Sequence, residues 1–244
     1  MVPAVFVPWA QPLLDAAGIR PGDRVLDVAC ATGTVARLAS KRLADSGSVT
    51  GLDLSERWLD VARRAASAEG VRVDWRCGNA ASLPFDSGSF DVVLCQQGIQ
   101  FFDDREAALH EMHRVLAPRG RFGASVFRSI DESPGYRSLA RALGRHVSRE
   151  SEERIRGIFS LGDPEELRAL MVSAGFQEID VHPETGLVQF PKAEDFPHIY
   201  AMICEAAPGA TEAVIRDVAR ELRDHCGPGG LSFPMQALIA RGGK

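Results

Sequence analysis

The sequence has no hydrophobic run long enough to cross a bilayer and no excess of positive charge. Its apolar stretches extend over only a few residues, whereas a membrane-spanning helix needs about 20. The formal net charge of −5 disfavours the broad basic surface that binds nucleic-acid backbones. Residues Met1 to Pro8 lack a basic segment and contain two prolines, so they make a poor signal peptide. We therefore expect a cytoplasmic chain that neither spans a membrane nor binds nucleic acid.

Paired cysteines and metal-ligand spacings are also missing. The five cysteines are scattered without a C-x-x-C pair, which fits reduced thiols better than a disulfide framework or a zinc site. His110 and His113 share one face of an expected helix, but no third ligand is near them in the sequence and the H-E-x-x-H spacing is absent. We therefore predict no metal site.

Short apolar runs alternate with helical patterns through the first half of the chain. Apolar runs bounded by turn residues predict buried strands at residues 24–29, 48–53, 71–76, 90–95 and 121–127. Helical spacing fills residues 34–43, 55–69 and 105–116 between them. Strands that alternate with helices of this length form a parallel sheet covered on both faces. The sequence therefore predicts an α/β fold with a doubly wound, mostly parallel sheet.

The second half of the chain is richer in helical patterns. These patterns occupy residues 133–160, 163–175 and 194–226. Residues 176–190 predict one or two further strands, and a last strand covers Phe233 to Arg241. Because no flexible linker separates the two halves, we predict a single domain over residues 1–244.

The segment Val25 to Gly33 runs from a strand through a tight loop into a helix. Such a turn gathers backbone N–H groups and the positive end of a helix, where an anionic or polar ligand can bind. A dinucleotide loop reads G-x-G-x-x-G, but Ala29 and Ala31 occupy the first two small positions here. Asp27 suits a cationic group, and Asp53 can accept hydrogen bonds from both hydroxyls of a ribose. A nucleoside joined to a zwitterionic amino acid satisfies all of these features.

Further motifs follow in register with this segment. They are G-N-A-A-S-L-P-F at residues 78–85, F-D-V-V at 90–93 and a helix-turn-strand motif at 111–120. Over roughly residues 21–127 the sequence resembles the class I S-adenosylmethionine-dependent methyltransferases, especially the ubiquinone/menaquinone-type branch that also contains many natural-product enzymes. The resemblance implies S-adenosylmethionine as cofactor, S-adenosylhomocysteine as product and a small-molecule acceptor. It also implies a seven-stranded Rossmann-like sheet whose last strand enters antiparallel near one edge.

The resemblance divides the predicted domain into a cofactor-binding core at 20–128, a helical lid on the substrate side at 129–226 and a final strand at 227–244. Residues 1–19 are expected to join the lid in roofing the site. The implied cofactor contacts are Asp27, Ala29, Cys30, Ala31, Gly33, Asp53, Leu54, Trp58, Asn79, Ala80 and Gln96. Four of them depart from the family pattern, and two of these, Ala29 and Ala31, stand where the family has glycines. Asn79 replaces an aspartate that contacts the adenine amino group, and Trp58 replaces a methionine, so packing on the cofactor and packing in the core are equally open for it.

No catalytic triad is recognisable in the sequence. An in-line displacement of the methyl group depends mainly on proximity and alignment, so none is required. Gln97, His198 and Tyr200 are candidates for positioning the acceptor, and the catalytic residues are otherwise unknown. Two alternatives stay open: a protein of this fold that binds the cofactor without methyl transfer, and a nicotinamide-dependent oxidoreductase, which the missing glycine pattern disfavours. The acceptor stays open too, as does the choice between monomer and homodimer.

Overall fold

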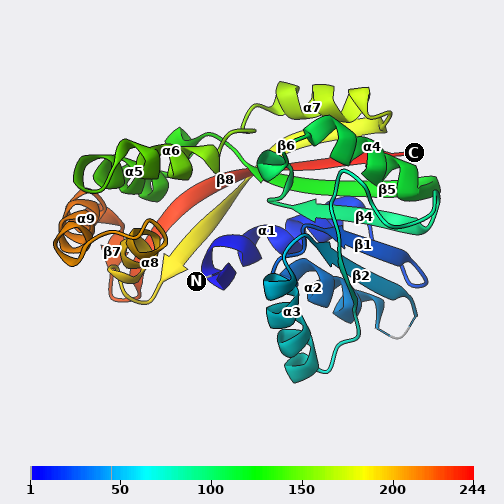
Figure 1. Ribbon diagram of the computed structural model, residues 1–244, viewed down its shortest axis with the longest axis horizontal. Coiled ribbons are helices and arrows are strands. Elements are labelled where there is room, and N and C mark those ends of the chain that lie inside the picture. Colours follow the sequence, from blue (N-terminus) through cyan, green and yellow to red (C-terminus); the bar gives the residue numbers. More distant parts are fainter. Residues whose placement is uncertain (1, 45) are drawn as a thin grey trace. The chain divides into compact units, whose positions relative to one another are not determined.

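The computed structural model describes residues 2–44 and 46–244 (Figure 1). The chain divides into two compact units. The sheet unit consists of Trp9–Val126, Leu161–Glu184 and Leu238–Lys244. The helical unit consists of Met1–Pro8, Phe127–Ser160 and Thr185–Ala237. Each unit is therefore assembled from segments that are far apart in the sequence.

The strands form one sheet in the order β3-β2-β1-β4-β5-β8-β6. Their bounds are β1 (Arg24–Val28), β2 (Ser48–Asp53), β3 (Asp74–Cys77), β4 (Phe90–Gln96), β5 (Leu116–Phe127), β6 (Gln177–Phe190), β7 (Cys226–Gly227) and β8 (Gly230–Gly243), with β7 paired to β8. The pairs β1–β2, β1–β4, β2–β3 and β4–β5 are parallel. The N–H of Arg128 donates to Gln236 O and that of Lys244 to Gly120 O, so β8 runs antiparallel to β5. The prediction of a mostly parallel α/β sheet is confirmed.

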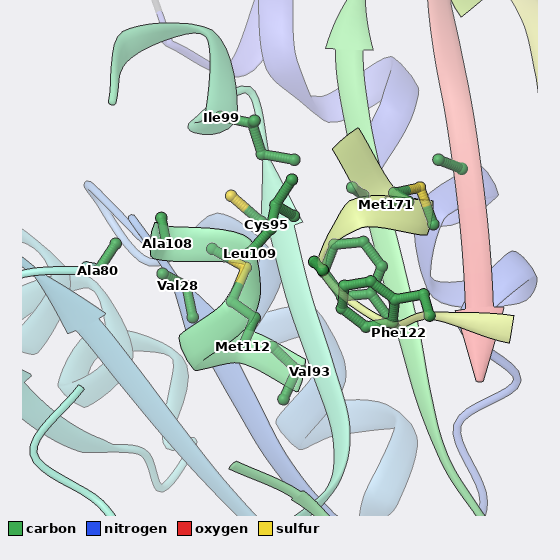
Figure 2. Packing of buried hydrophobic residues seen from close by; sticks show 14 of the residues in the cluster. Val28, Ala80, Val93, Cys95, Ile99, Ala108, Leu109, Met112, Phe122 and Met171 are labelled. Atoms are coloured by element: carbon green, nitrogen blue, oxygen red, sulfur yellow. The ribbon is translucent and has the colours of Figure 1, made fainter. Parts of the chain in front are cut away.

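Helices cover both faces of this sheet. They are α1 (Val2–Ala17), α2 (Thr34–Leu43), α3 (Glu56–Glu69), α4 (Arg105–Val115) and α7 (Pro164–Ser173). On one face, Leu13 of α1 and residues of α2 pack with Val25 and Val92. On the other face α4 and α7 pack on the sheet, and Figure 2 shows Met112 of α4 in this core with Val93 of β4. Because β1 and β4 are apolar on both faces, they lie in the middle of the sheet.

The second half of α1 lies against the sheet. Its apolar residues Ala10, Leu13, Leu14 and Ala17 are buried in the hydrophobic core that α1 and α2 form with the sheet. Their spacing of three or four residues places them on one face of the helix. This stretch is therefore part of the core, and the expectation that residues 1–19 roof the site is wrong for it.

The helical unit is built around an aromatic core. Its helices are α5 (Pro134–His146), α6 (Arg149–Gly157), α8 (Asp195–Ile203) and α9 (Pro208–Glu221). Tyr136 of α5 contacts the rings of Phe159, Phe196, Tyr200 and Phe233 at centroid distances of 5.3, 5.3, 5.4 and 6.5 Å. These contacts have the edge-to-face geometry that aromatic pairs favour. Through residues 2–44 and 46–244, no helix is both long and apolar enough to cross a bilayer.

Several predicted strand boundaries differ from the structure, among them the last strand, which is Gly230–Gly243 rather than 233–241. β3 begins at Asp74 rather than Val71, because the Val71 N–H donates to Ala66 O and completes the end of α3 instead of joining the sheet. β5 begins at Leu116 rather than Arg121, since the predicted turn is a bulge where the register against β4 shifts. The finer division of the chain into a cofactor-binding core and a lid stays a prediction.

Candidate functional site

The strand order reverses between β1 and β4. From β1 the chain moves outward through β2 and β3, then returns to the other side of β1 to form β4. Segments that leave the carboxyl ends of two such strands diverge, and α/β sheets bind their ligands at this point. The loop after β1 and the turn after β4 lie here, so the predicted motif is at the place where the fold binds ligands.

The loop after β1 has an unusual backbone. Ala29 and Ala31 have φ angles of 57° and 47°, and Gly33 has a φ of 73°. A left-handed conformation costs a residue with a Cβ roughly 1–2 kcal/mol, so the two alanines hold the loop under strain. At Gly33 a Cβ would lie 2.3 Å from Cη2 of Trp75, so glycine is required there for space as well as for its φ angle.

Asp53, the last residue of β2, holds this loop in place. Its Oδ2 accepts the Ala31 N–H at 2.8 Å and its Oδ1 accepts the Ser55 N–H at 2.9 Å. A carboxylate offers about four lone-pair directions, so each oxygen retains capacity for another donor. The side chain is 9% exposed. Asp53 therefore presents two oriented acceptors at the end of β2.

Asp27 is the buried acid of the same segment. Its Oδ2 accepts the Ala36 N–H of α2 at 2.9 Å. Burial raises the pKa of Asp27 to about 8, against the lowering effect of that hydrogen bond and with a further increase from Asp53. Burial also raises the pKa of the neighbouring Cys30 thiol. Asp27 is thus a proton-bearing acid near neutral pH until a cation approaches it.

Exposed apolar side chains lie beside Asp53. Leu54 is 72% exposed, and Trp58, in the first turns of α3, is 46% exposed. Large apolar groups at this level of exposure next to a polar strand end indicate a surface that a flat apolar ligand group can cover. The structure therefore places Trp58 outside the core, and its packing on the cofactor stays a prediction.

Asn79 forms a tight turn with its own loop. Its Oδ1 accepts the Ala81 N–H at 2.9 Å, and the side chain is exposed, whereas Ala80 is buried. The amide oxygen that was expected to receive the adenine amino group thus already accepts one hydrogen bond from its own loop. Any contact of this oxygen with the adenine amino group would have to use its second lone pair.

The turn after β4 touches the loop after β1. A Cβ on Gly98 would lie 2.8 Å from the Ala29 Cβ and 2.7 Å from Cys95 Sγ, so only glycine permits this approach. Gln96 ends β4, and Gln97 has a φ of 54°. The loop after β1 thus contacts both the end of β2, through Ala31 and Asp53, and the turn after β4, through Ala29 and Gly98. The Gly78 N–H, just before Asn79, donates to Asp53 O.

Comparison with known proteins shows to which family the chain belongs. A methyltransferase-domain family matches residues 25–120. The demethylmenaquinone methyltransferase of Staphylococcus epidermidis is 32% identical over 190 residues, which cover 73% of this chain and 78% of that protein. The ubiquinone/menaquinone biosynthesis C-methyltransferase of Chromobacterium violaceum is 33% identical over 187 residues, covering 73% of this chain and 77% of its own length. The chain belongs to the S-adenosylmethionine-dependent methyltransferases of the ubiquinone/menaquinone branch.

This methyltransferase shares its fold with solved structures. The YcgJ protein from Bacillus subtilis has a TM-score of 0.66 at 20% sequence identity, and the match covers 96% of this chain and 97% of that chain. The predicted cofactor is confirmed: the methyltransferase moves a methyl group from S-adenosylmethionine to a small-molecule acceptor. The oxidoreductase alternative is therefore excluded by family membership.

The helical unit of the methyltransferase holds the two remaining candidates. His198 is exposed on α8. Tyr200 is buried, its hydroxyl is hydrogen-bonded to that of Tyr136, and burial raises its pKa to about 12. A hydroxyl with such a pKa is a poor general base at neutral pH. Tyr200 therefore has the properties of a core residue.

Two residues beside the predicted site, Gln100 and Trp75, were not selected from the sequence. Gln100 donates from Nε2 to Gln97 Oε1 at 2.9 Å, and the three-residue spacing in a short 3₁₀ turn was the available signal. Trp75 fills the space under Gly33. Among the described residues no group of three or more His, Cys, Asp or Glu side chains is placed so that it could hold a metal ion. His113 packs against the Phe176 ring at a centroid distance of 5.1 Å.

Proposed function

We propose that the methyltransferase holds S-adenosylmethionine at the carboxyl ends of β1, β2 and β4. The observation that carries this proposal is Asp53, whose two oxygens are oriented by the Ala31 and Ser55 N–H groups and retain lone pairs for two ribose hydroxyls. The proposed contacts are Asp27, Ala29, Cys30, Ala31, Gly33, Asp53, Leu54, Trp58, Asn79, Ala80 and Gln96.

These contacts divide by chemistry. The strained loop at Ala29 and Ala31 brings backbone close to the methionine part, and Asp27 lies beneath it to balance a cationic group. Leu54 and Trp58 supply the apolar surface for the base. The bound cofactor supplies a methyl group already activated by its sulfonium. The protein's residues have to orient the two reactants and exclude water.

We propose an electron-rich hydroxylated aromatic ring, of the quinol type, as the acceptor. Both named relatives carry quinone names. The polar residues proposed beside the methyl group are the neutral amides Gln96 and Gln97, which bind hydroxyl and carbonyl oxygens without needing a charge. Methyl transfer to such a ring would replace a ring proton by the methyl group and release that proton, and Gln96 and Gln97 would hold the ring oxygens so that the reacting carbon faces the methyl group.

The pathway class, the location and the partners of the protein are proposed from more general observations. The broader expectation of natural-product biosynthesis is a weaker candidate than quinone biosynthesis, because the relatives' names favour quinones. We also propose that the chain binds no nucleic acid, on the basis of the net charge of −5. The scattered cysteines support a cytoplasmic location, where the protein would be a monomer or homodimer.

The test is release of S-adenosylhomocysteine with a panel of acceptors. We expect turnover with a reduced demethylated naphthoquinone, and a product heavier by one methylene group, by mass spectrometry. The same ring already methylated at the reacting carbon is the matched control and is expected to give no product. Turnover with a hydroxyl or amine substrate but not with either naphthoquinol would overturn the acceptor proposal, while leaving methyl transfer in place.

A further inference from the structure

A single indole ring, that of Trp75, packs against two glycines from different segments of the sheet unit. A Cβ on Gly33 would lie 2.3 Å from Cη2 of Trp75, and a Cβ on Gly51 would lie 2.5 Å from its Cζ3. Cβ atoms do not come so close to other heavy atoms, so the ring lies in direct contact with both glycines. Trp75 therefore fills the space that a side chain at either glycine would need.

The strand register explains how the ring reaches the loop after β1. Trp75 of β3 pairs with Gly51 of β2, and Gly51 pairs in turn with Asp27 of β1. Because Gly51 has no side chain, the ring can lie across β2 and extend to Gly33 beyond the end of β1. The φ angle of Gly51 is outside the left-handed region, so space alone requires glycine there.

Gly33 is the point at which the loop after β1 becomes α2. Its N–H donates to Cys30 O at 2.7 Å, and its own carbonyl accepts the Arg37 N–H at 2.9 Å. The loop N–H groups and the positive end of α2 meet at this residue. A displacement of Gly33 would therefore move the loop and the start of the helix together.

Trp75 is enclosed only in part. Its side chain is half-buried, and it borders a surface depression of about 650 Å³ together with Val49, Ala66 and Val73. A ring beside open space can be displaced a short way without unfolding the strand that carries it. The position of the ring can therefore be changed by substitution beneath it.

We propose that Trp75 is a positioning residue for the cofactor, which sets the place of Gly33 and hence of the loop after β1. Trp75 is not among the proposed cofactor contacts, so its effect passes through the backbone of Gly33. Correct placement of the loop aligns its N–H groups with the methionine part of the cofactor, and small misplacements at such sites are costly. This inference rests on the proposed cofactor site.

Gly51→Ala tests the proposal, because it displaces the ring without changing a proposed cofactor contact. Its methyl group would lie 2.5 Å from Cζ3 of Trp75, so the ring has to move. We expect the affinity for S-adenosylhomocysteine, measured by calorimetry, to fall about tenfold as the loop N–H groups lose their alignment. In the Trp75→Leu background no indole opposes the methyl group, so Gly51→Ala should change the affinity by less than about twofold.

A matched control and a spectroscopic signal separate positioning from general packing. In Gly123→Ala, on β5 of the same unit, the new Cβ would lie 3.0 Å from the Ala17 Cβ, away from the loop. This control should lower stability and leave the affinity for S-adenosylhomocysteine unchanged. The chain has three tryptophans, so fluorotryptophan labelling gives a resolvable ¹⁹F NMR spectrum. The Trp75 signal, assigned with Trp75→Leu, should shift in Gly51→Ala and when S-adenosylhomocysteine binds.

Several outcomes would overturn the role of Trp75. One is an unchanged affinity in Gly51→Ala, and another is a Trp75 signal that does not respond to S-adenosylhomocysteine. An equal loss in both backgrounds would assign the effect to another neighbour of the methyl group, such as Cys30 Sγ at 3.2 Å. Wild-type affinity in Asp53→Asn would show that the proposed cofactor site itself is wrong. A loss in Asp53→Asn with none in Gly51→Ala would refute Trp75 alone.

Discussion

In the sheet unit the buried acids Asp27 and Asp53 accept hydrogen bonds from backbone N–H groups, whereas in the helical unit the buried Tyr200 bonds another side chain, Tyr136. A carboxylate held by the backbone is oriented and keeps lone pairs for a ligand. A hydroxyl paired with a hydroxyl inside a ring of aromatics has its hydrogen bond satisfied within the protein. The same property, a buried polar atom, thus indicates binding in one unit and packing in the other. The predictions below test that distinction.

The largest effect is expected in the aromatic core of the helical unit. Phe196 is fully buried, and its ring lies 5.1 Å from Phe233 and 5.4 Å from Phe190. Phe196→Ala should lower the free energy of unfolding by about 3–5 kcal/mol, because it leaves a cavity in packed aromatics. Leu187→Ala, at a residue 56% exposed in the same unit, is the control for chemical denaturation. A loss below about 1 kcal/mol for Phe196→Ala would mean that the helical unit is not held by this core.

Asp27 provides a test through pH. Its pKa is raised in the fold from 3.8 to about 8, so the stability it contributes is fully present below pH 4 and is lost as the pH rises through 8. Asp27→Asn keeps an oxygen for the Ala36 N–H but cannot ionise. We expect the ligand-free variant to lose less stability than the wild type between pH 4 and 8, with a slope difference of at most about 1.4 kcal/mol per pH unit. If thermal unfolding showed the same pH dependence of stability in the wild type and in Asp27→Asn, the raised pKa of Asp27 would be contradicted.

A substitution of Asp53 tests whether the buried acids of the sheet unit bind the cofactor. Asp53→Asn replaces one acceptor oxygen with a donor, so it should weaken S-adenosylhomocysteine binding by about 3 kcal/mol, or roughly 100-fold, in calorimetry. The exposed Asp60 of α3 offers the matched control, since Asp60→Asn removes a charge of the same sign nearby. If Asp53→Asn and Asp60→Asn bound S-adenosylhomocysteine with equal affinity, Asp53 would not be a cofactor contact.

The sheet unit was largely predictable because its signals are local. Continuous apolar runs predict β1, β2 and β4, and an acidic residue within or at the end of such a run is easy to recognise in the sequence. The left-handed φ angles of Ala29 and Ala31 were not predictable, since alanine ordinarily avoids that region and only the surrounding hydrogen bonds impose it. The engagement of the Asn79 oxygen by its own turn escaped prediction for a similar reason, because the side chain's partner depends on the local backbone.

The helical unit was less predictable at the level of single residues. Its helices follow from periodicity, but the partner of Tyr200 comes from α5, 64 residues earlier in the chain. Sequence spacing cannot show that two hydroxyls meet in a core built from distant segments. Residue type and a place in the expected lid were the only signals for His198 and Tyr200, and the structure gives the first an exposed position and the second a buried partner.

A substitution of Asn79 is expected to strengthen cofactor binding, by less than the Asp53 substitution weakens it. In Asn79→Asp one carboxylate oxygen can keep the Ala81 N–H while the other accepts the adenine amino group, which the present Nδ2 cannot do. We expect S-adenosylhomocysteine to bind about tenfold more tightly. The matched ligand is the analogue with a carbonyl in place of the adenine amino group, for which the gain should vanish. A gain that is the same for both ligands would point to charge rather than to this hydrogen bond.

The smallest effect on activity is expected at Tyr200. This residue tests whether a buried polar atom of the helical unit serves packing alone. Tyr200→Phe keeps the ring and removes the hydroxyl, so Tyr136 loses its partner and stability should fall by about 1 kcal/mol. Because a hydroxyl with a pKa of about 12 is a poor base, kcat should stay within about twofold of the wild type. A general base would instead contribute roughly 10²–10⁴-fold. A loss of that size in Tyr200→Phe, with S-adenosylhomocysteine affinity and folding intact, would show that the buried hydroxyl of the helical unit takes part in catalysis, and that burial beside another side chain does not separate packing from chemistry.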